Sequence, residues 1–261
     1  MEAMLGPREK EADLAVDEKM LREVTAYIQQ WDEHLDTWFG DKVELAGKRL
    51  LVIGSGWGSE ILWALKRGVG HVTGIDPRSD DRAFVEQALA EQGLSQLSDR
   101  FALLLGTAPT APDLGGFDLI LSNNVFEHVE GLATNLAALG RFLPDKGGRI
   151  HIFTDPLFYA SKGHHLPIGA WEHLTQTQAA VRERVNPRQW REYRNGLNGM
   201  TITSFLGAVR EAGLILLALG IRPDPDIETY VATAKQFPPG LKPMDLCLSG
   251  ISCTLAFPHN I

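Results

Sequence analysis

The stretch Leu50–Glu60 reads LLVIGSGWGSE and decides the fold class. Its four leading apolar residues predict a strand that is buried on both faces, and three closely spaced glycines follow before a helical pattern begins. Glycine allows positive φ and lets a ligand approach bare main chain. The helix behind the turn offers unpaired N–H groups and a partial positive charge to a carboxylate or phosphate. The stretch therefore predicts the nucleotide-binding corner of an open parallel sheet.

Strand and helix patterns alternate along the chain on both sides of this corner. Apolar runs predict strands at 48–53, 71–76, 101–105, 117–122, 147–153, 214–219 and 246–257. Helical spacing predicts helices that begin at Ser59 and span 79–92, 131–143 and 203–212, the last with Thr203 as its N-cap, and residues 224–236 also look helical. This alternation indicates an α/β fold, a doubly wound and mostly parallel sheet with helices on both sides.

Two segments lie outside the alternation. Apolar residues at helical spacing over 21–38 predict a helix that Gly40 ends and that covers a sheet edge, where Trp31 or Trp38 could also border a ligand site. Residues 154–200 interrupt the rhythm and predict an insertion above the carboxyl ends of the strands. We therefore expect a single domain over 1–261, with an N-terminal helical extension at 1–44 and a substrate cap at 154–200.

Composition narrows the classes of function. The chain of 261 residues carries a net charge of −8, which argues against nucleic acid as a partner. Its sequence has neither an apolar run of about 18 residues nor the apolar core of a signal peptide, so we expect no membrane span and a cytoplasmic location. Cys247 and Cys253 are expected on one strand, too far apart for a disulfide and buried as thiols.

An acid at the end of the second predicted strand narrows the ligand. Asp76 follows Gly56 by 20 residues, where an acid accepts hydrogen bonds from ribose hydroxyls. Dinucleotide sites usually place the third glycine three residues after the second, but here Gly58 comes two after Gly56. This compact form resembles motif I of class I S-adenosylmethionine-dependent methyltransferases. A turn that serves only strand–helix packing, or a dinucleotide site, remains an alternative.

Other segments carry the same resemblance. Gly74–Asp76 resembles the ribose-binding segment, Phe117–Val129 the fourth-strand signature and Phe142–Gly148 the turn into the fifth strand. The resemblance implies a Rossmann-like sheet of seven strands whose last strand is antiparallel, and S-adenosylmethionine as cofactor. Many relatives carry an acid beside the adenine, where this chain has Thr107-Ala108. The implied donor-binding residues are Gly54, Ser55, Gly56, Trp57, Gly58, Asp76, Pro77, Thr107, Ala108, Asn123 and Asn124.

Methyl transfer from a sulfonium needs alignment of donor and acceptor, and an oxygen or nitrogen acceptor can also need a base. The histidines best placed for such a catalytic role are His128, His164 and His165, and His173 is a weaker candidate. A structural role in a loop is the alternative for each. No metal site is predicted, because the sequence lacks a fixed ligand spacing such as two histidines four apart on a helix.

The predicted cap contains five arginines in a helical segment that Asn186-Pro187 interrupts. They fit either a solvated helix or the capture of an acidic acceptor, and nearby aromatic residues suit a ring-bearing acceptor. The arginines are Arg182, Arg184, Arg188, Arg191 and Arg194. We expect methyl transfer to a small molecule, acidic or aromatic, by O-methylation of a sugar or natural-product-type metabolite. An NAD(P)-dependent oxidoreductase and a non-catalytic S-adenosylmethionine-binding regulatory protein are the alternatives, and the sequence leaves the oligomeric state open.

Overall fold

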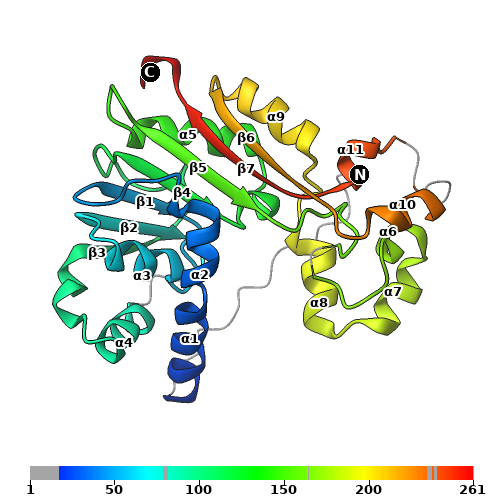
Figure 1. Cartoon of the computed structure of the whole chain (residues 1–261), viewed down its shortest axis with the longest axis horizontal. Coiled ribbons are helices and arrows are strands. Elements are labelled where there is room, and N and C mark those ends of the chain that lie inside the picture. The colour runs from blue at the N-terminus through cyan, green and yellow to red at the C-terminus, as the bar shows by residue number, and fades with distance from the viewer. Residues whose placement is uncertain (1–17, 79–81, 164, 234–236, 238–239, 261) are drawn as a thin grey trace.

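Figure 1 shows the computed structural model of the chain, which describes residues 18–78, 82–163, 165–233, 237 and 240–260. Its centre is a seven-stranded sheet in the order β3-β2-β1-β4-β5-β7-β6. The strands are β1 Arg49–Ile53, β2 His71–Asp76, β3 Phe101–Leu105, β4 Leu119–Asn123, β5 Arg149–Thr154, β6 Ile215–Pro223 and β7 Leu248–Ala256.

The strand directions are those of the predicted sheet. Strands β1 to β5 are parallel, and β7 runs antiparallel to both β5 and β6. The predicted fold class is therefore confirmed. Because β1 pairs with β2 on one side and β4 on the other, the strand order reverses at β1. Ligands of open α/β sheets bind beyond the carboxyl ends of the strands at such a reversal.

Helices pack on both faces of the sheet and bury alternate residues of its strands. Leu50 and Val52 of β1 join the core that the first helix layer covers, whereas Leu51 and Ile53 join the core on the other face. The first layer consists of α1 Glu18–Gln30, α3 Ser59–Lys66 and α4 Ala83–Glu91, and the second of α5 Leu132–Ala138 and α9 Ile202–Glu211. Short 3-10 helices lie at η2 Ser95–Arg100, η3 Phe126–His128, η4 Leu139–Phe142 and η7 Pro258–Asn260.

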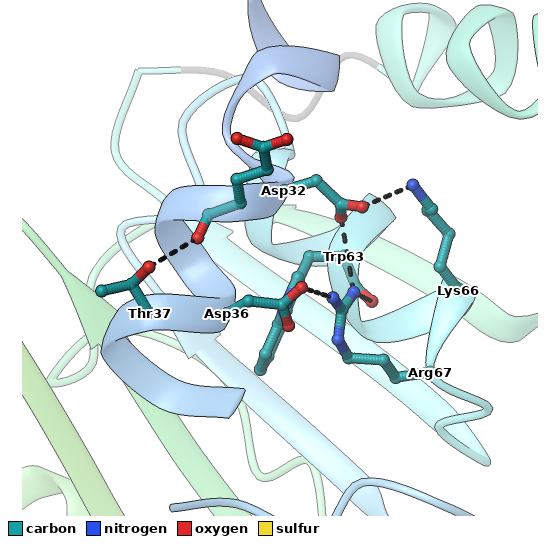
Figure 2. A network of polar contacts seen from close by, with 7 residues as sticks. Asp32, Asp36, Thr37, Trp63, Lys66 and Arg67 are labelled. Atoms are coloured by element: carbon teal, nitrogen blue, oxygen red, sulfur yellow. Dashed lines mark hydrogen bonds and ion pairs between the residues drawn. The ribbon is translucent and has the colours of Figure 1, made fainter. Parts of the chain in front are cut away.

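The N-terminal helix is broken where the sequence predicts a continuous one. After α1 come α2, Asp32–Leu35, and a π-helical turn η1, Asp36–Gly40, so Gly40 ends the segment as predicted. Figure 2 shows how polar contacts tie this segment to α3. Asp32 accepts from Lys66 at 2.5 Å and from Arg67 at 3.4 Å, while Asp36 pairs with Arg67 and accepts from the indole of Trp63 at 3.2 Å. These contacts fix α2 and η1 against the helix that follows the glycine turn.

The described residues between 154 and 200 form short helices that follow β5, and a second segment joins them. Between β6 and β7 lie α10 Ile227–Thr233 and α11 Pro243–Leu246. The Ser161 amide donates to Asp224 at 2.7 Å, the Ser161 hydroxyl donates to Asp226 at 2.9 Å, and the Trp171 ring contacts Tyr230. The helices of the first segment are α6 Glu172–Thr175, α7 Gln178–Arg184 and α8 Pro187–Arg191, followed by a π-helical turn η5 Glu192–Gly196. We call residues 154–200 the cap.

Two local predictions were wrong. Thr201, not Thr203, is the N-cap of α9, because its hydroxyl accepts from the Ser204 amide at 3.0 Å in a reciprocal capping box. Cys247 ends α11 and only Cys253 lies on β7, so the cysteines do not share a strand, although both are free. Cys253 is buried as expected, whereas Cys247 is partly exposed. Among the helices described, none has the length and apolarity needed to cross a bilayer.

Candidate active site

The glycine corner, residues 54–58, forms the turn between β1 and α3. Gly54, Gly56 and Gly58 all have positive φ, at 73°, 50° and 99°. A Cβ atom on Gly54 would lie 2.2 Å from a methyl of Val125, and one on Gly58 would lie 2.3 Å from a methyl of Val85. At Gly56 a Cβ atom would meet no described atom within 4 Å. The outer glycines are thus required by packing, whereas the middle one presents bare main chain to open space.

Asp76 holds the glycine corner from the end of β2. Its side chain is buried, with 2% of the residue exposed. Oδ2 accepts from the Gly56 amide at 2.9 Å and Oδ1 accepts from the Arg78 amide at 2.8 Å. A carboxylate has about four acceptor positions, so capacity for further donors remains. Pro77, also predicted to bind the donor, follows directly and is exposed.

The carboxyl end of β4 lies beside the glycine corner. Asn123 is buried and donates to Glu60 Oε1 at 2.8 Å, and its own Oδ1 is buried with no partner among the described residues. Asn124 has positive φ, 52°, and its Oδ1 accepts from the Asp155 amide at 2.8 Å. Ser55 packs its buried hydroxyl against Gly74, so the contact it can offer a ligand is through the main chain.

Glu60, in the first turn of α3, is a residue of this region that the sequence analysis missed. Only 6% of it is exposed. Burial raises its pKa to about 7, the hydrogen bond from Asn123 opposes this, and the nearby Asp76 adds to it. No basic side chain of the described residues contributes to its ionisation or forms an ion pair with it. A buried carboxylate without a cation thus lies beside the glycine corner.

The end of β3 completes this edge. The Thr107 hydroxyl lies 3.0 Å from that of Thr110, and the Thr107 amide donates to Thr110 Oγ1 at 3.0 Å. Ala108 is buried, and its carbonyl accepts from Arg141 at 2.5 Å. Both predicted residues therefore lie at the same edge of the sheet as Asp76, within a turn fixed by its own hydrogen bonds.

A row of aromatic rings borders the glycine corner. Trp57 contacts Tyr27 edge to face at 5.7 Å, and the row continues through Trp31 and Trp38 to Phe153 at the end of β5. Trp57 and Tyr27 are 38% and 43% exposed. Burial raises the pKa of Tyr27, while Arg188 of the cap lowers it, which places α8 near this row. Trp31 and Trp38 thus belong to one aromatic row that begins at Trp57 in the glycine corner.

Of the predicted catalytic histidines, His128 follows β4 directly. Its Nδ1 lies 2.5 Å from the Gly196 carbonyl, which can only accept, so Nδ1 donates to it, and Nε2 lies 4.0 Å from Oε1 of Glu127. Asn198 fixes the same turn, because its side chain donates at 2.7 Å to the carbonyls of Phe126 and Val129. The end of the cap therefore positions His128.

The other histidines lie within the cap. His165 lines a hollow of about 280 Å³ together with Asn186, Arg188 and Glu192. His164 lies outside the described residues. His173 is buried, its Nε2 is 2.8 Å from the Phe158 carbonyl, and burial lowers its pKa to about 4. The structure thus brings His128, but not His165, to the turn that packs on Gly54.

Ion pairs and ring contacts within the cap engage four of its five arginines. Arg184 pairs with Glu172 at 2.5 Å and Arg188 with Glu192 at 3.4 Å. Arg182 and Arg194 both lie 5.9 Å from the Trp190 ring centroid. Asn186 caps α8, which confirms the predicted interruption of the helix. These contacts favour a role in holding the cap together for most of the arginines, rather than capture of an acceptor. Among the five, Arg188 alone also lines the hollow.

The fold and the glycine corner define a class of protein. Residues 51–152 match a family model described as a methyltransferase domain. The sheet topology and this match together confirm the predicted superfamily, the class I S-adenosylmethionine-dependent methyltransferases. S-adenosylmethionine is the cofactor of that superfamily. A search of curated protein sequences finds no match.

Solved structures share the fold at low identity. A protein from Galdieria sulphuraria described as a sarcosine dimethylglycine methyltransferase is 15% identical, with a TM-score of 0.55 over 89% of this chain and 87% of its own. Geranyl diphosphate C-methyltransferase from Streptomyces coelicolor A3(2), which holds S-adenosylhomocysteine, is 15% identical, with a TM-score of 0.56 over 93% and 85%. The cyclase SpnF is 18% identical, with a TM-score of 0.55 over 88% and 82%. The reactions named for these three proteins differ, so the fold alone leaves the acceptor open.

Proposed function

We propose that this protein transfers the methyl group of S-adenosylmethionine to an oxygen of a small metabolite, of the sugar or natural-product type. The observation that carries the proposal is the glycine corner. Gly56 faces open space while the buried Asp76 holds its amide and keeps acceptor capacity for ribose hydroxyls. The donor-binding set predicted from the sequence is part of this proposal.

The acceptor is proposed to bind between the aromatic row and the cap. Tyr27 and Trp57 offer exposed ring faces, and Arg188 lies close enough to influence the Tyr27 hydroxyl. Rings and a guanidinium suit a ring-bearing or acidic acceptor. In this arrangement the whole chain acts as one unit, and the segment of α10 and α11 supports the cap.

Ligand-induced stabilisation tests the donor. The melting temperature is measured with S-adenosylhomocysteine and, separately, with NADH, because a ligand at 100 times its Kd stabilises a protein by about 2.7 kcal/mol. We expect a shift with S-adenosylhomocysteine only. A shift with NADH alone would favour an oxidoreductase. Binding without transfer of labelled methyl to any component of a broad metabolite extract would favour a non-catalytic regulatory protein.

Replacement of His128 by alanine is expected to lower kcat by about 100-fold or more, because general base catalysis contributes that much when the acceptor must lose a proton. His165→Ala is the matched variant in the cap and should change KM more than kcat. Steady-state kinetics with the identified acceptor separates the two effects. A His128→Ala enzyme with wild-type kcat would show that alignment alone carries the reaction.

A further inference from the structure

Glu60 is the buried acid of the glycine corner that the proposed chemistry does not yet use. It lies in the first turn of α3, directly behind Gly58, and its Oε1 accepts from Asn123 at 2.8 Å. Groups from each neighbouring element act on it: Asp76 from β2, the Tyr27 hydroxyl from α1 and the neutral Asn123 from β4. None of these is a cation. Burying an ionised carboxylate without a cation is costly, so a positively charged ligand group would stabilise the ionised form of Glu60.

The proposed donor supplies such a partner. Its methionine part carries an α-carboxylate and an α-ammonium on one carbon. The positive end of α3, eight residues long, with N–H groups behind the glycine corner, suits the carboxylate. Because the ammonium shares its carbon with that carboxylate, a donor held in this way would bring it to the first turn of the same helix. Asp76, at the end of β2, already accepts from the main-chain amides of Gly56 and Arg78, so Glu60 is the carboxylate that α3 itself supplies.

We infer that the carboxylate of Glu60 pairs with the α-ammonium of the donor and thereby selects a ligand with an intact amino-acid end. This inference rests on the proposed function. Asn123 acts as a positioning residue, because its amide holds one oxygen of the Glu60 carboxylate at the end of β4.

Donor binding is therefore coupled to release of a proton. In the free protein, burial holds the pKa of Glu60 at about 7, and pairing with an ammonium lowers it. Below pH 7 the free protein must lose a proton from Glu60 before the pair can form, so affinity rises with pH up to about 7 and then levels off. Between pH 6 and pH 8 the ionised fraction of such a group rises about tenfold, and the affinity should rise by the same factor.

Calorimetric titration with two ligands tests the inference. S-adenosylhomocysteine carries the amino-acid end, whereas 5′-methylthioadenosine keeps the nucleoside and lacks it. Glu60→Gln preserves the volume and the acceptor for Asn123 but removes the charge. We expect the variant to bind S-adenosylhomocysteine roughly 10- to 100-fold more weakly, as for loss of a charged hydrogen bond. The affinity of the variant for 5′-methylthioadenosine should stay within threefold of the wild-type value. Its affinity for S-adenosylhomocysteine should no longer depend on pH.

Glu127→Gln is the matched control, since Glu127 is equally buried with a pKa raised to about 7 but lies beyond Asn124 on the turn after β4. It should keep both the affinity for S-adenosylhomocysteine and its pH dependence. The inference is overturned if Glu60→Gln binds S-adenosylhomocysteine like the wild type, or if it loses 5′-methylthioadenosine to the same extent. The pH profile of the wild type tests it without any variant. Failure of the wild type to bind S-adenosylhomocysteine would overturn the proposed function as well. The wild-type titration therefore distinguishes that failure from a failure of the inference about Glu60 alone.

Discussion

A Gly56→Ala protein should fold normally and bind S-adenosylhomocysteine roughly 10- to 100-fold more weakly than the wild type. Gly56 has a φ of 50°, so an alanine there costs about 1–2 kcal/mol in backbone strain. No described atom lies within 4 Å of the added Cβ, so no packing is lost. The Cβ instead occupies the space proposed for the donor, where one misplaced carbon weakens binding by about that factor. Calorimetric titration and thermal unfolding measure the two effects.

Two other glycines separate ligand binding from stability. Gly47, before β1, also has positive φ, 70°, with nothing within 4 Å of a Cβ, and lies at the opposite end of the strand. Gly47→Ala should show the same loss of stability and unchanged affinity. Gly58→Ala adds a clash with Val85, so we expect a loss of about 3 kcal/mol and a melting temperature lower by roughly 6 to 12 °C. Equal affinities for Gly56→Ala and Gly47→Ala would contradict the placement of the donor.

The sheet and the glycine corner could be predicted from sequence because their signals are local. Strands such as β1 and β3 are nearly continuous apolar runs, and Gly58 and Asp76 follow Gly56 by two and 20 residues. A strand buried on both faces tolerates few other patterns. The strand bounds differed by a few residues because polar residues such as Asn123 can still extend a ladder.

The missed features depend on contacts between distant segments. Glu60 looks like a polar residue of an amphipathic helix until Asn123, 63 residues later, is placed beside it. The pairing of Ser161 with Asp224 likewise spans 63 residues, so nothing local signals that α10 and α11 join the cap. Asn198 lies 72 residues after Phe126, whose carbonyl its side chain binds, so its hold on the His128 turn also requires knowledge of the fold. Sequence periodicity predicts which face is buried, not which partner covers it.

Glu127 gives the second large prediction, which concerns stability. It is 1% exposed, and neither carboxylate oxygen has a hydrogen-bond partner among the described residues. Burial raises its pKa to about 7, and the facing hydroxyl of Thr154 offsets this only in part. The unfolded chain ionises this group near pH 4.5, whereas the folded protein ionises it near pH 7. Folding is therefore penalised progressively as pH rises from 4.5 to 7, and fully above pH 7.

Glu127→Gln removes that penalty. The shift corresponds to about 3 kcal/mol, so the stability of the variant relative to the wild type should increase by about that amount between pH 4.5 and pH 7 and then stay constant. Urea unfolding at pH 5, 6, 7 and 8 measures the difference. A difference independent of pH would show that the Glu127 carboxyl group is already ionised in the folded protein throughout this range.

The comparison must be made between variant and wild type, because two buried histidines act in the opposite direction. Burial lowers the pKa of His151 and of His173 to about 4, so the unfolded chain takes up protons from pH 6.5 downward and stability falls as pH falls. These losses oppose the gain that protonation of Glu60 and Glu127 gives over nearly the same range. The wild type should therefore vary little in stability between pH 5 and 7. Glu127→Gln should unmask the histidines and become steadily more stable as pH rises from 5 to 7.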